Sequence, residues 1–381
     1  MDRSSIGKVD GQSLGSSERE SGIELFRIIV MLLIIAHHYV VNSGLASLDG
    51  PIFTNGFQAK STMLLLAGMW GKTGINCFVL ITGYFMCAKQ VTLKKFLKLL
   101  FEELFYRFLF FFVFIFAGYE TLSFGKIIKL LLPITSVEHN FTGCFLIFFL
   151  LIPWLTALVD HLNKKNHLKL IAVGFFVYTI LGTIPGIDVT FNYVTWFSFL
   201  FIIAAYLRFY PVKILEDTEI NTLLLVFGMI IAMVSVVVLF YVTTSSYGAR
   251  LASLLKLEPG FILCYYFEYE TNMILALVLA ILAFCFFKNI KIKQSRIINT
   301  IAASTYGVFL IHTISDTMRN FLWQHLFNNV GAYYTGNIYL HLICTVLCIF
   351  AVGTVIDMMR RRFLEKPFFD WYDRKEIKKK L

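Results

Sequence analysis

Long apolar runs separated by short polar segments make up most of the sequence from residue 23 onward. A bilayer core needs about 20 mostly apolar residues per helix, so each run of that length predicts one transmembrane helix. The runs are 23–41, 62–87, 97–117, 141–158, 168–184, 191–210, 222–242, 272–287, 298–315 and 338–359. Because 258–271 is ambiguous, nine to eleven helices are possible. The pattern predicts an all-α, polytopic membrane helix bundle of about ten transmembrane helices.

The two ends of the chain are polar. Residues 1–22 lack a short apolar stretch followed by a small-residue cleavage site, so the first apolar run is expected to be retained. We therefore expect a cytoplasmic N-terminal segment over 1–22, one transmembrane domain over 23–359 and a basic cytoplasmic tail over 360–381. No linker or internal repeat divides the transmembrane part.

Basic residues are concentrated in alternate loops. If the N-terminus is inside, 25 of the 34 Lys and Arg residues fall on the cytoplasmic side, and every cytoplasmic loop carries at least two. Cytoplasmic loops of membrane proteins carry this excess of positive charge. The distribution predicts that both termini are cytoplasmic.

Composition supports the membrane class, since 58% of residues are hydrophobic and 15% are charged. Soluble domains average about 25% charged residues. The net charge of +10 follows the loop asymmetry, so no nucleic-acid partner is expected. The seven cysteines lie mostly inside apolar runs and form no CxxC pair, which predicts small core residues and no metal site.

The first apolar run contains ionisable residues, each costing about 2.5–3.5 kcal/mol within a span. Arg27 and His38 are 11 residues apart, which places them within about 20° of one helix face and about 16 Å apart along the axis. His37 points about 80° away from Arg27. Arg27 and His38 are both candidate functional residues. Alternatively, Arg27 extends to the inner interface and His38 bonds a neighbouring helix.

Later spans add further candidates. His312 and Tyr306 lie in the run 298–315, and His312 is expected at the depth of His38. Glu103 and Arg107 lie one turn apart in the run 97–117. An internal ion pair that neutralises itself is favoured over catalysis for these two residues.

Three glycines in the second span, Gly71, Gly74 and Gly83, predict close helix packing. The segment from Gly71 to Thr73 is similar to the end of a phosphate-binding loop. Leu66 occupies the place of the first glycine and no strand precedes it, so that reading is rejected.

Together, these features resemble acyltransferase family 3, a family of integral-membrane O-acyltransferases. The matching segments, in chain order, are Arg27 with His38, the glycine-rich segment 71–84, the basic stretch Lys94, Lys95 and Lys98, the segment 306–312, and Glu365-Lys366-Pro367. The resemblance covers nearly the whole chain at the family's spacing. Two departures are Thr82 in place of the usual Ser and lysines in place of arginines in the basic stretch.

The resemblance implies transfer of an acyl group, most often acetyl from acetyl-CoA, to a sugar hydroxyl of a cell-envelope or exported glycan. The enzyme would be a multi-pass protein of the bacterial plasma membrane with no tightly bound cofactor. Arg27, Lys94, Lys95 and Lys98 suit the donor phosphates. His38 suits a general base or a covalent acyl carrier, and the sequence does not separate these roles.

The rival class is a membrane transporter of a glycan precursor or small acid, in which intramembrane His and Glu relay protons. Many secondary transporters contain structural repeats, and none is detectable in this sequence. The sequence does not identify the glycan acceptor, the acyl chain or the oligomeric state.

Overall fold

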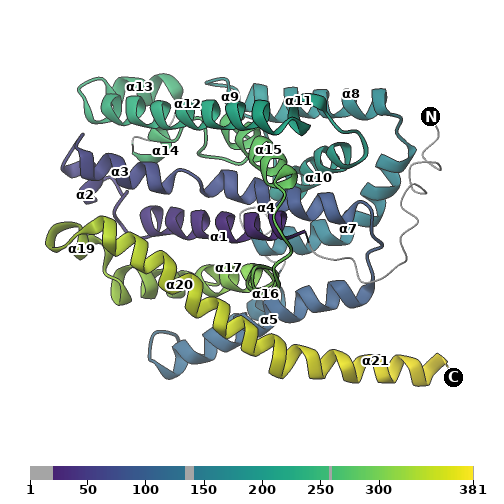
Figure 1. The fold of residues 1–381 in the computed structure, drawn as a ribbon. Coiled ribbons are helices and arrows are strands. Elements are labelled where there is room, and N and C mark those ends of the chain that lie inside the picture. Colours follow the sequence, from purple (N-terminus) through teal and green to yellow (C-terminus); the bar gives the residue numbers. More distant parts are fainter. Residues whose placement is uncertain (1–19, 134–140, 257–259, 381) are drawn as a thin grey trace.

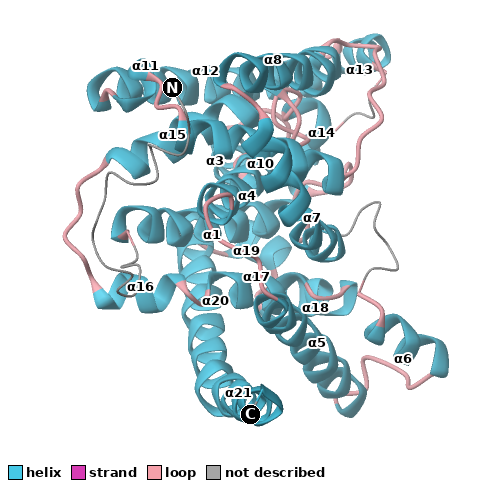
Figure 2. Cartoon of the chain, turned by 90° about the vertical axis from the view of Figure 1, so that its right-hand side faces the viewer, coloured by secondary structure: helices cyan, strands magenta, loops and turns pink. Residues whose placement is uncertain are grey.

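The computed structural model describes residues 20–133, 141–256 and 260–380, so most of the expected N-terminal segment 1–22 lies outside the described residues. Within these ranges the chain folds into helices and contains no strand (Figures 1 and 2). The prediction of an all-α fold is confirmed.

The longer helices are α1 (Ser21–Val41), α4 (Gly71–Met86), α5 (Leu93–Phe116), α7 (Phe141–His161), α10 (Tyr193–Phe209), α12 (Thr218–Thr244), α15 (Ile274–Asn289), α20 (Ile338–Arg360) and α21 (Lys366–Lys380). The shorter helices are α2 (Pro51–Thr54), α3 (Ala59–Gly68), α6 (Phe124–Leu131), α8 (Lys164–Gly174), α9 (Leu181–Thr183), α11 (Lys213–Glu216), α13 (Gly248–Leu255), α14 (Phe261–Cys264), α16 (Arg296–Ala302), α17 (Thr305–Thr313), α18 (Asp316–Asn320) and α19 (Asn329–Thr335). Wider π-helical turns join some of them, over Phe175–Ile180, Phe321–Leu326 and Arg361–Glu365.

Each predicted apolar run coincides with one helix or with consecutive helices. Among the described residues, six helical segments are long and apolar enough to cross a membrane, or seven if the bent pair 296–313 and 316–335 is one span. The helices α10 and α15 are shorter, and α5 carries several charges. In its described part, 258–271 forms only α14 and turns. A multi-pass helical membrane protein is therefore supported, and the count of about ten spans stays a prediction.

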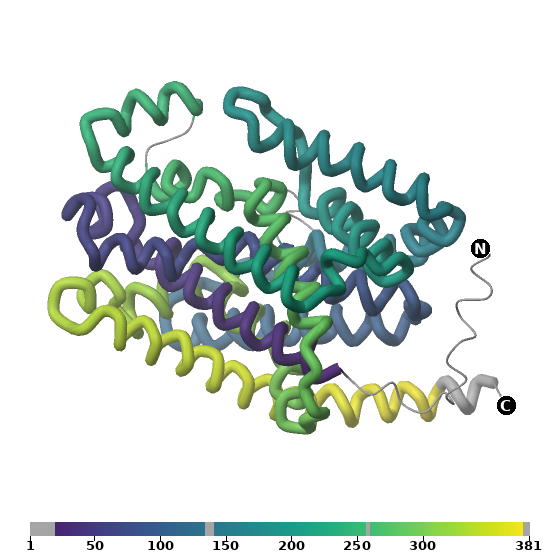
Figure 3. Tube along the Cα trace, turned by 45° about the horizontal axis from the view of Figure 1, so that its top comes forward, coloured from purple at the N-terminus to yellow at the C-terminus, as the bar shows by residue number. Residues whose placement is uncertain are grey.

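Helix α1 occupies the middle of the bundle and packs against α3, α4, α15, α16, α17 and α20 (Figure 2). Its first residue lies beside α16, where Ser21 Oγ donates a hydrogen bond to Asn299 Oδ1 at 3.1 Å. The end of α20 reaches the same helix, because Arg361 Nη2 donates to the Thr300 carbonyl oxygen at 3.2 Å. The start of α1 and the end of α20 thus lie on one side of the bundle (Figure 3), as an even number of crossings requires.

The outer faces of the peripheral helices are apolar. On α12, Leu223, Phe227, Ile230, Val234 and Val238 are spaced at helical intervals and are 48–70% exposed. A soluble protein rarely leaves such a large apolar surface uncovered, whereas lipid covers it at no cost. This stripe fits contact with the bilayer.

The cysteines divide between interior and periphery. Five are buried, as expected for small core residues: Cys77, Cys87, Cys144, Cys264 and Cys285. The expectation is wrong for Cys344 and Cys348, which lie one turn apart on the exposed face of α20. A thiol is apolar enough to face lipid, so an apolar run alone does not distinguish the two environments.

We expect the positive-inside orientation to be visible by cysteine labelling in intact cells. In a background with Cys344 and Cys348 replaced by serine, single cysteines at Lys165 and Lys291 should be shielded from a membrane-impermeant thiol reagent. A cysteine that replaces Asp188 should react with the reagent. All three positions are exposed, so only the membrane separates them from the reagent. Labelling at Lys165 without labelling at Asp188 would reverse the orientation.

Candidate active site

Two histidines that are far apart in the sequence meet inside the bundle. His38 lies in the last turn of α1, and His312 lies in the last turn of α17. Their Nδ1 and Nε2 atoms are 3.0 Å apart, and the ring centroids are 5.2 Å apart. His312 is fully buried, whereas His38 is partly exposed. The two imidazoles share a depth, and the accessible one is His38.

The hydrogen bonds of His312 determine which nitrogens carry protons. His312 Nδ1 lies 2.6 Å from the carbonyl oxygen of Val308, which can only accept, so this nitrogen carries the hydrogen. In a neutral His312 ring, Nε2 is then an acceptor, and His38 Nδ1–H must donate to it. A neutral His38 therefore has its lone pair on Nε2. This nitrogen can take up a proton.

His37 faces a different part of the bundle. Its Nδ1 lies 2.5 Å from the carbonyl oxygen of Gly68, at the end of α3. A Cβ atom on Gly71, the first residue of α4, would overlap the His37 ring. His37 thus holds the α3–α4 junction, while His38 faces α17. This divergence is the one expected from their positions on a helix.

Both histidine contacts lie near irregular turns in the helices. Residues 69 and 70 form a turn between α3 and α4, beside His37, within the continuous helical segment 59–86. After His312, the chain turns by 88° between the helical segment ending at Thr313 and the one starting at Asp316. Interrupted backbone is tolerated inside a membrane only where protein or a polar cavity surrounds it. These turns thus mark the polar interior.

The three glycines of the second span lie against neighbouring helices. A Cβ on Gly74 would come within 2.8 Å of Ile34 on α1. A Cβ on Gly83 would come within 3.0 Å of Ala204 on α10. Gly71 and Gly74 let α4 approach α1 closely at the level of His37.

Lys72 forms a polar group with Tyr193 and Glu270 beside the histidines. Its Nζ donates to Tyr193 Oη at 2.9 Å and to Glu270 Oε1 at 2.8 Å. Lys72 follows Gly71, where an added Cβ would overlap the His37 ring. No sequence pattern indicates this group. A lysine in a span signals that a partner is needed, but the pattern does not say which residue supplies it.

Arg27 lies three turns before His38 on α1, about 16 Å away along the helix axis. Its Nε is 3.8 Å from Glu24 Oε2, and its side chain is 26% exposed. A small apolar cavity of about 10 Å³ lies alongside α1 between the two levels and is lined in part by Met31, Ile34 and Phe309. The cation and the imidazole are thus separated by apolar packing.

The three lysines of the basic stretch lie in the first two turns of α5. Lys94 Nζ is 2.6 Å from Asp373 Oδ2 on α21, and Lys98 Nζ is 3.5 Å from Glu365 Oε1. Lys95 Nζ donates to the Gln90 carbonyl oxygen at 2.7 Å. The two ion pairs join α5 to the C-terminal helix.

Glu103 and Arg107 form the internal ion pair favoured on sequence grounds. Arg107 Nη2 is 2.7 Å from Glu103 Oε1 and 3.3 Å from Thr142 Oγ1. Tyr306 packs against Phe145, with ring centroids 5.8 Å apart. None of the hydrogen bonds described for these residues reaches the His38–His312 pair.

A second polar cluster, also missed by the sequence analysis, lies where α5 meets the end of α20. Arg360 is 2% exposed and contacts Glu102 at 3.1 Å, Asp357 at 2.9 Å and Glu365 at 2.7 Å. Tyr106 Oη donates to Asp357 Oδ1 at 2.9 Å. The sequence predicts that Arg360 belongs to the basic tail, because no local pattern distinguishes a buried arginine from its exposed neighbours.

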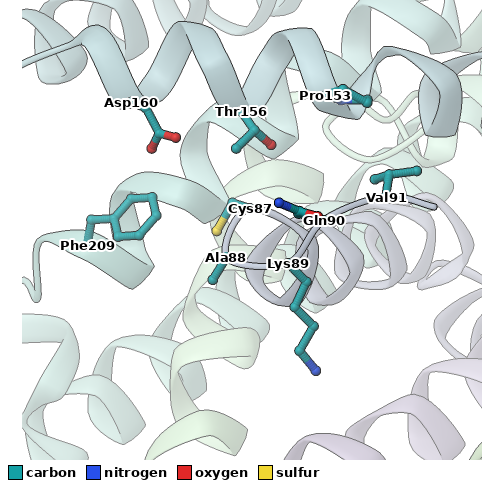
Figure 4. Close-up of a pocket in the computed structure, with 9 residues that line it drawn as sticks. All are labelled: Cys87, Ala88, Lys89, Gln90, Val91, Pro153, Thr156, Asp160 and Phe209. Atoms are coloured by element: carbon teal, nitrogen blue, oxygen red, sulfur yellow. The ribbon is translucent and has the colours of Figure 1, made fainter. Parts of the chain in front are cut away.

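A surface cavity of about 540 Å³ lies at the far end of α4 from Lys72 (Figure 4). It is lined by the α4–α5 connection, including Cys87 and Lys89, and by Thr156 and Asp160 of α7. One lysine and one aspartate give it no excess of positive charge, so it does not stand out as a phosphate site.

The fold and the site define a multi-pass helical membrane protein with a histidine pair inside the helix bundle. A family model described as an acyltransferase domain matches residues 20–359. The chain therefore belongs to acyltransferase family 3, which implies acyltransferase activity in general. No curated protein and no solved structure matches the chain.

We expect Gly71→Ala to destabilise the protein, because the added Cβ would overlap the His37 ring. Overpacking of this kind costs about 1–3 kcal/mol. The matched control is Gly125→Ala on α6, where no heavy atom lies within 4 Å of the new Cβ. Thermal unfolding in detergent should show a lower midpoint for Gly71→Ala only. Equal midpoints for the two variants would contradict the close approach of α4 to α1.

Proposed function

We propose that the protein transfers an acyl group, most simply acetyl from acetyl-CoA, to a sugar hydroxyl of a cell-envelope or exported glycan. Family membership supports the reaction class. The observation that carries the residue assignment is the His38–His312 hydrogen bond, which directs the lone pair of a neutral His38 to Nε2. The site would operate in the cell membrane, with the acceptor on the outer side.

In this proposal His38 is the general base. Its Nε2 removes the proton from the acceptor hydroxyl as the oxygen attacks the thioester carbonyl carbon. His312 is a positioning residue, since it accepts the Nδ1–H of His38 and is itself held by the Val308 carbonyl oxygen. A histidine suits this role because its ordinary pKa lies close to neutral pH.

The donor is proposed to enter from the cytoplasm, with its phosphates near Arg27, Lys94, Lys95 and Lys98. The distance of about 16 Å from Arg27 to His38 suits a donor whose thioester arm extends along α1 while its phosphates stay inside. The small apolar cavity between the two levels lies on this path and would have to widen. Donor phosphates that bind Lys94 and Lys98 would displace the carboxylates of Asp373 and Glu365 from these lysines.

We predict that His38→Ala abolishes acyl transfer while the protein still accumulates, and that His37→Ala leaves measurable activity. Loss of a general base costs about 10²–10⁴-fold in rate. His37 uses its Nδ1 for the Gly68 carbonyl, so its loss removes a structural contact. Glycan O-acetylation in cells, normalised to the amount of membrane protein, compares the two variants. An active His38→Ala would refute the assignment, and equal losses would indicate a structural requirement at that depth.

Arg27→Ala is expected to weaken use of acetyl-CoA far more than it lowers protein abundance. Arg27→Lys should recover only part, because an ammonium cannot offer the planar, bidentate donors of a guanidinium. The measurement is the initial rate of CoA release by purified protein as a function of acetyl-CoA concentration. If Arg27→Ala keeps the donor dependence of the natural protein, Arg27 does not bind the donor.

A further inference from the structure

Lys72 has a hydrogen-bond donor left over for a ligand. An ammonium carries three N–H donors, and the described residues supply two acceptors, Tyr193 Oη and Glu270 Oε1. The Lys72 side chain is 20% exposed, so the third N–H can be reached from outside the protein core. The two partners restrict where the ammonium can lie.

Lys72 lies at the depth of the histidine pair. It follows Gly71, whose Cα lies against the His37 ring, and the His37 and His38 ring centroids are 5.5 Å apart.

The partners of Lys72 come from the ends of two short helices. Tyr193 is the first residue of α10, and Glu270 precedes α15 by four residues. Both helices therefore begin near the level of Lys72, and irregular segments rather than helices lie beyond them. In the predicted orientation those segments face outward, where the acceptor would enter.

We propose that Lys72 is a catalytic residue that donates its third N–H to the carbonyl oxygen of the acyl group as negative charge develops there. Glu270 and Tyr193 are positioning residues that hold the ammonium. Fixed donors aimed at a developing oxyanion are among the largest contributions to acyl-transfer catalysis. This inference rests on the proposed function and adds the group that stabilises the transition state.

The donor in this step is a thioester. The acceptor oxygen forms a bond to the carbonyl carbon, its proton moves to His38 Nε2, and the carbonyl π electrons move onto oxygen beside Lys72. The C=O bond then re-forms and the C–S bond breaks. The leaving thiolate takes the proton from His38, which returns the histidine to its neutral form.

The test compares Lys72→Gln, Lys72→Arg, Glu270→Gln and a control, Lys60→Gln. Lys60 lies on α3, and its Nζ also contacts a tyrosine, donating to the Tyr333 carbonyl oxygen at 2.8 Å and lying 4.8 Å from the ring centroid. Purified protein in liposomes is assayed for CoA release from acetyl-CoA, with water alone and with a panel of methyl glycosides as acceptors. Thermal unfolding checks that each variant is folded.

We expect Lys72→Gln to lower kcat by about 10²–10³-fold in both hydrolysis and transfer, as for loss of one oxyanion donor. KM for acetyl-CoA should change little. Lys72→Arg should retain part of the activity, and Glu270→Gln should lose less than Lys72→Gln because the cation remains. Lys60→Gln should keep the natural kcat.

Three results would overturn the inference. A loss confined to glycoside transfer, with hydrolysis intact, would assign Lys72 to acceptor binding. Equal losses in Lys72→Gln and Glu270→Gln, with lowered unfolding midpoints, would assign it to a structural ion pair. If folded Lys72→Gln keeps the kcat of the natural protein, Lys72 has no catalytic role. If the natural protein itself releases no CoA, the proposed function fails and this inference with it.

Discussion

A polar group inside a bundle surrounded by lipid is costly unless it finds a partner within the protein, because hydrocarbon offers none. The interior of this protein is organised by that requirement. His312 holds His38, and Glu270 and Tyr193 hold Lys72. Each of these contacts joins elements from distant parts of the chain. The hydrogen bonds that satisfy these buried polar groups also bring the residues of the candidate site together.

Close helix packing and turns in the chain together place the site near the last turn of α1. Glycines in α3 and α4 let α1 approach within distances that a Cβ would prevent, and His37 bonds the backbone where α3 ends. On the other side of α1, the 88° turn after α17 ends the helix next to His312. Polar groups therefore gather around the last turn of α1, and apolar packing separates them from Arg27.

The C-terminal helical segment contacts the lysines proposed to bind the donor phosphates. Asp373 and Glu365 occupy two of the lysines proposed to bind donor phosphates, and Arg360 joins α5 to α20 through buried carboxylates. Donor binding at Lys94 and Lys98 would therefore compete with contacts inside the protein. The sequence pattern places Arg360, Glu365 and Asp373 in the basic tail and does not indicate these contacts.

Local pattern was sufficient for the helices and the family. Each run of about 20 apolar residues coincides with one helix or with consecutive helices, whereas short helices such as α6 and α13 lie outside the runs. The spacing of Arg27 and His38 predicts a shared face, since both lie on one helix. The pairing of His38 with His312, 274 positions away, and of Lys72 with Glu270, 198 positions away, came only from the tertiary structure. Which side chains meet across helices depends on how each helix is rotated, broken and packed, and no local periodicity encodes that.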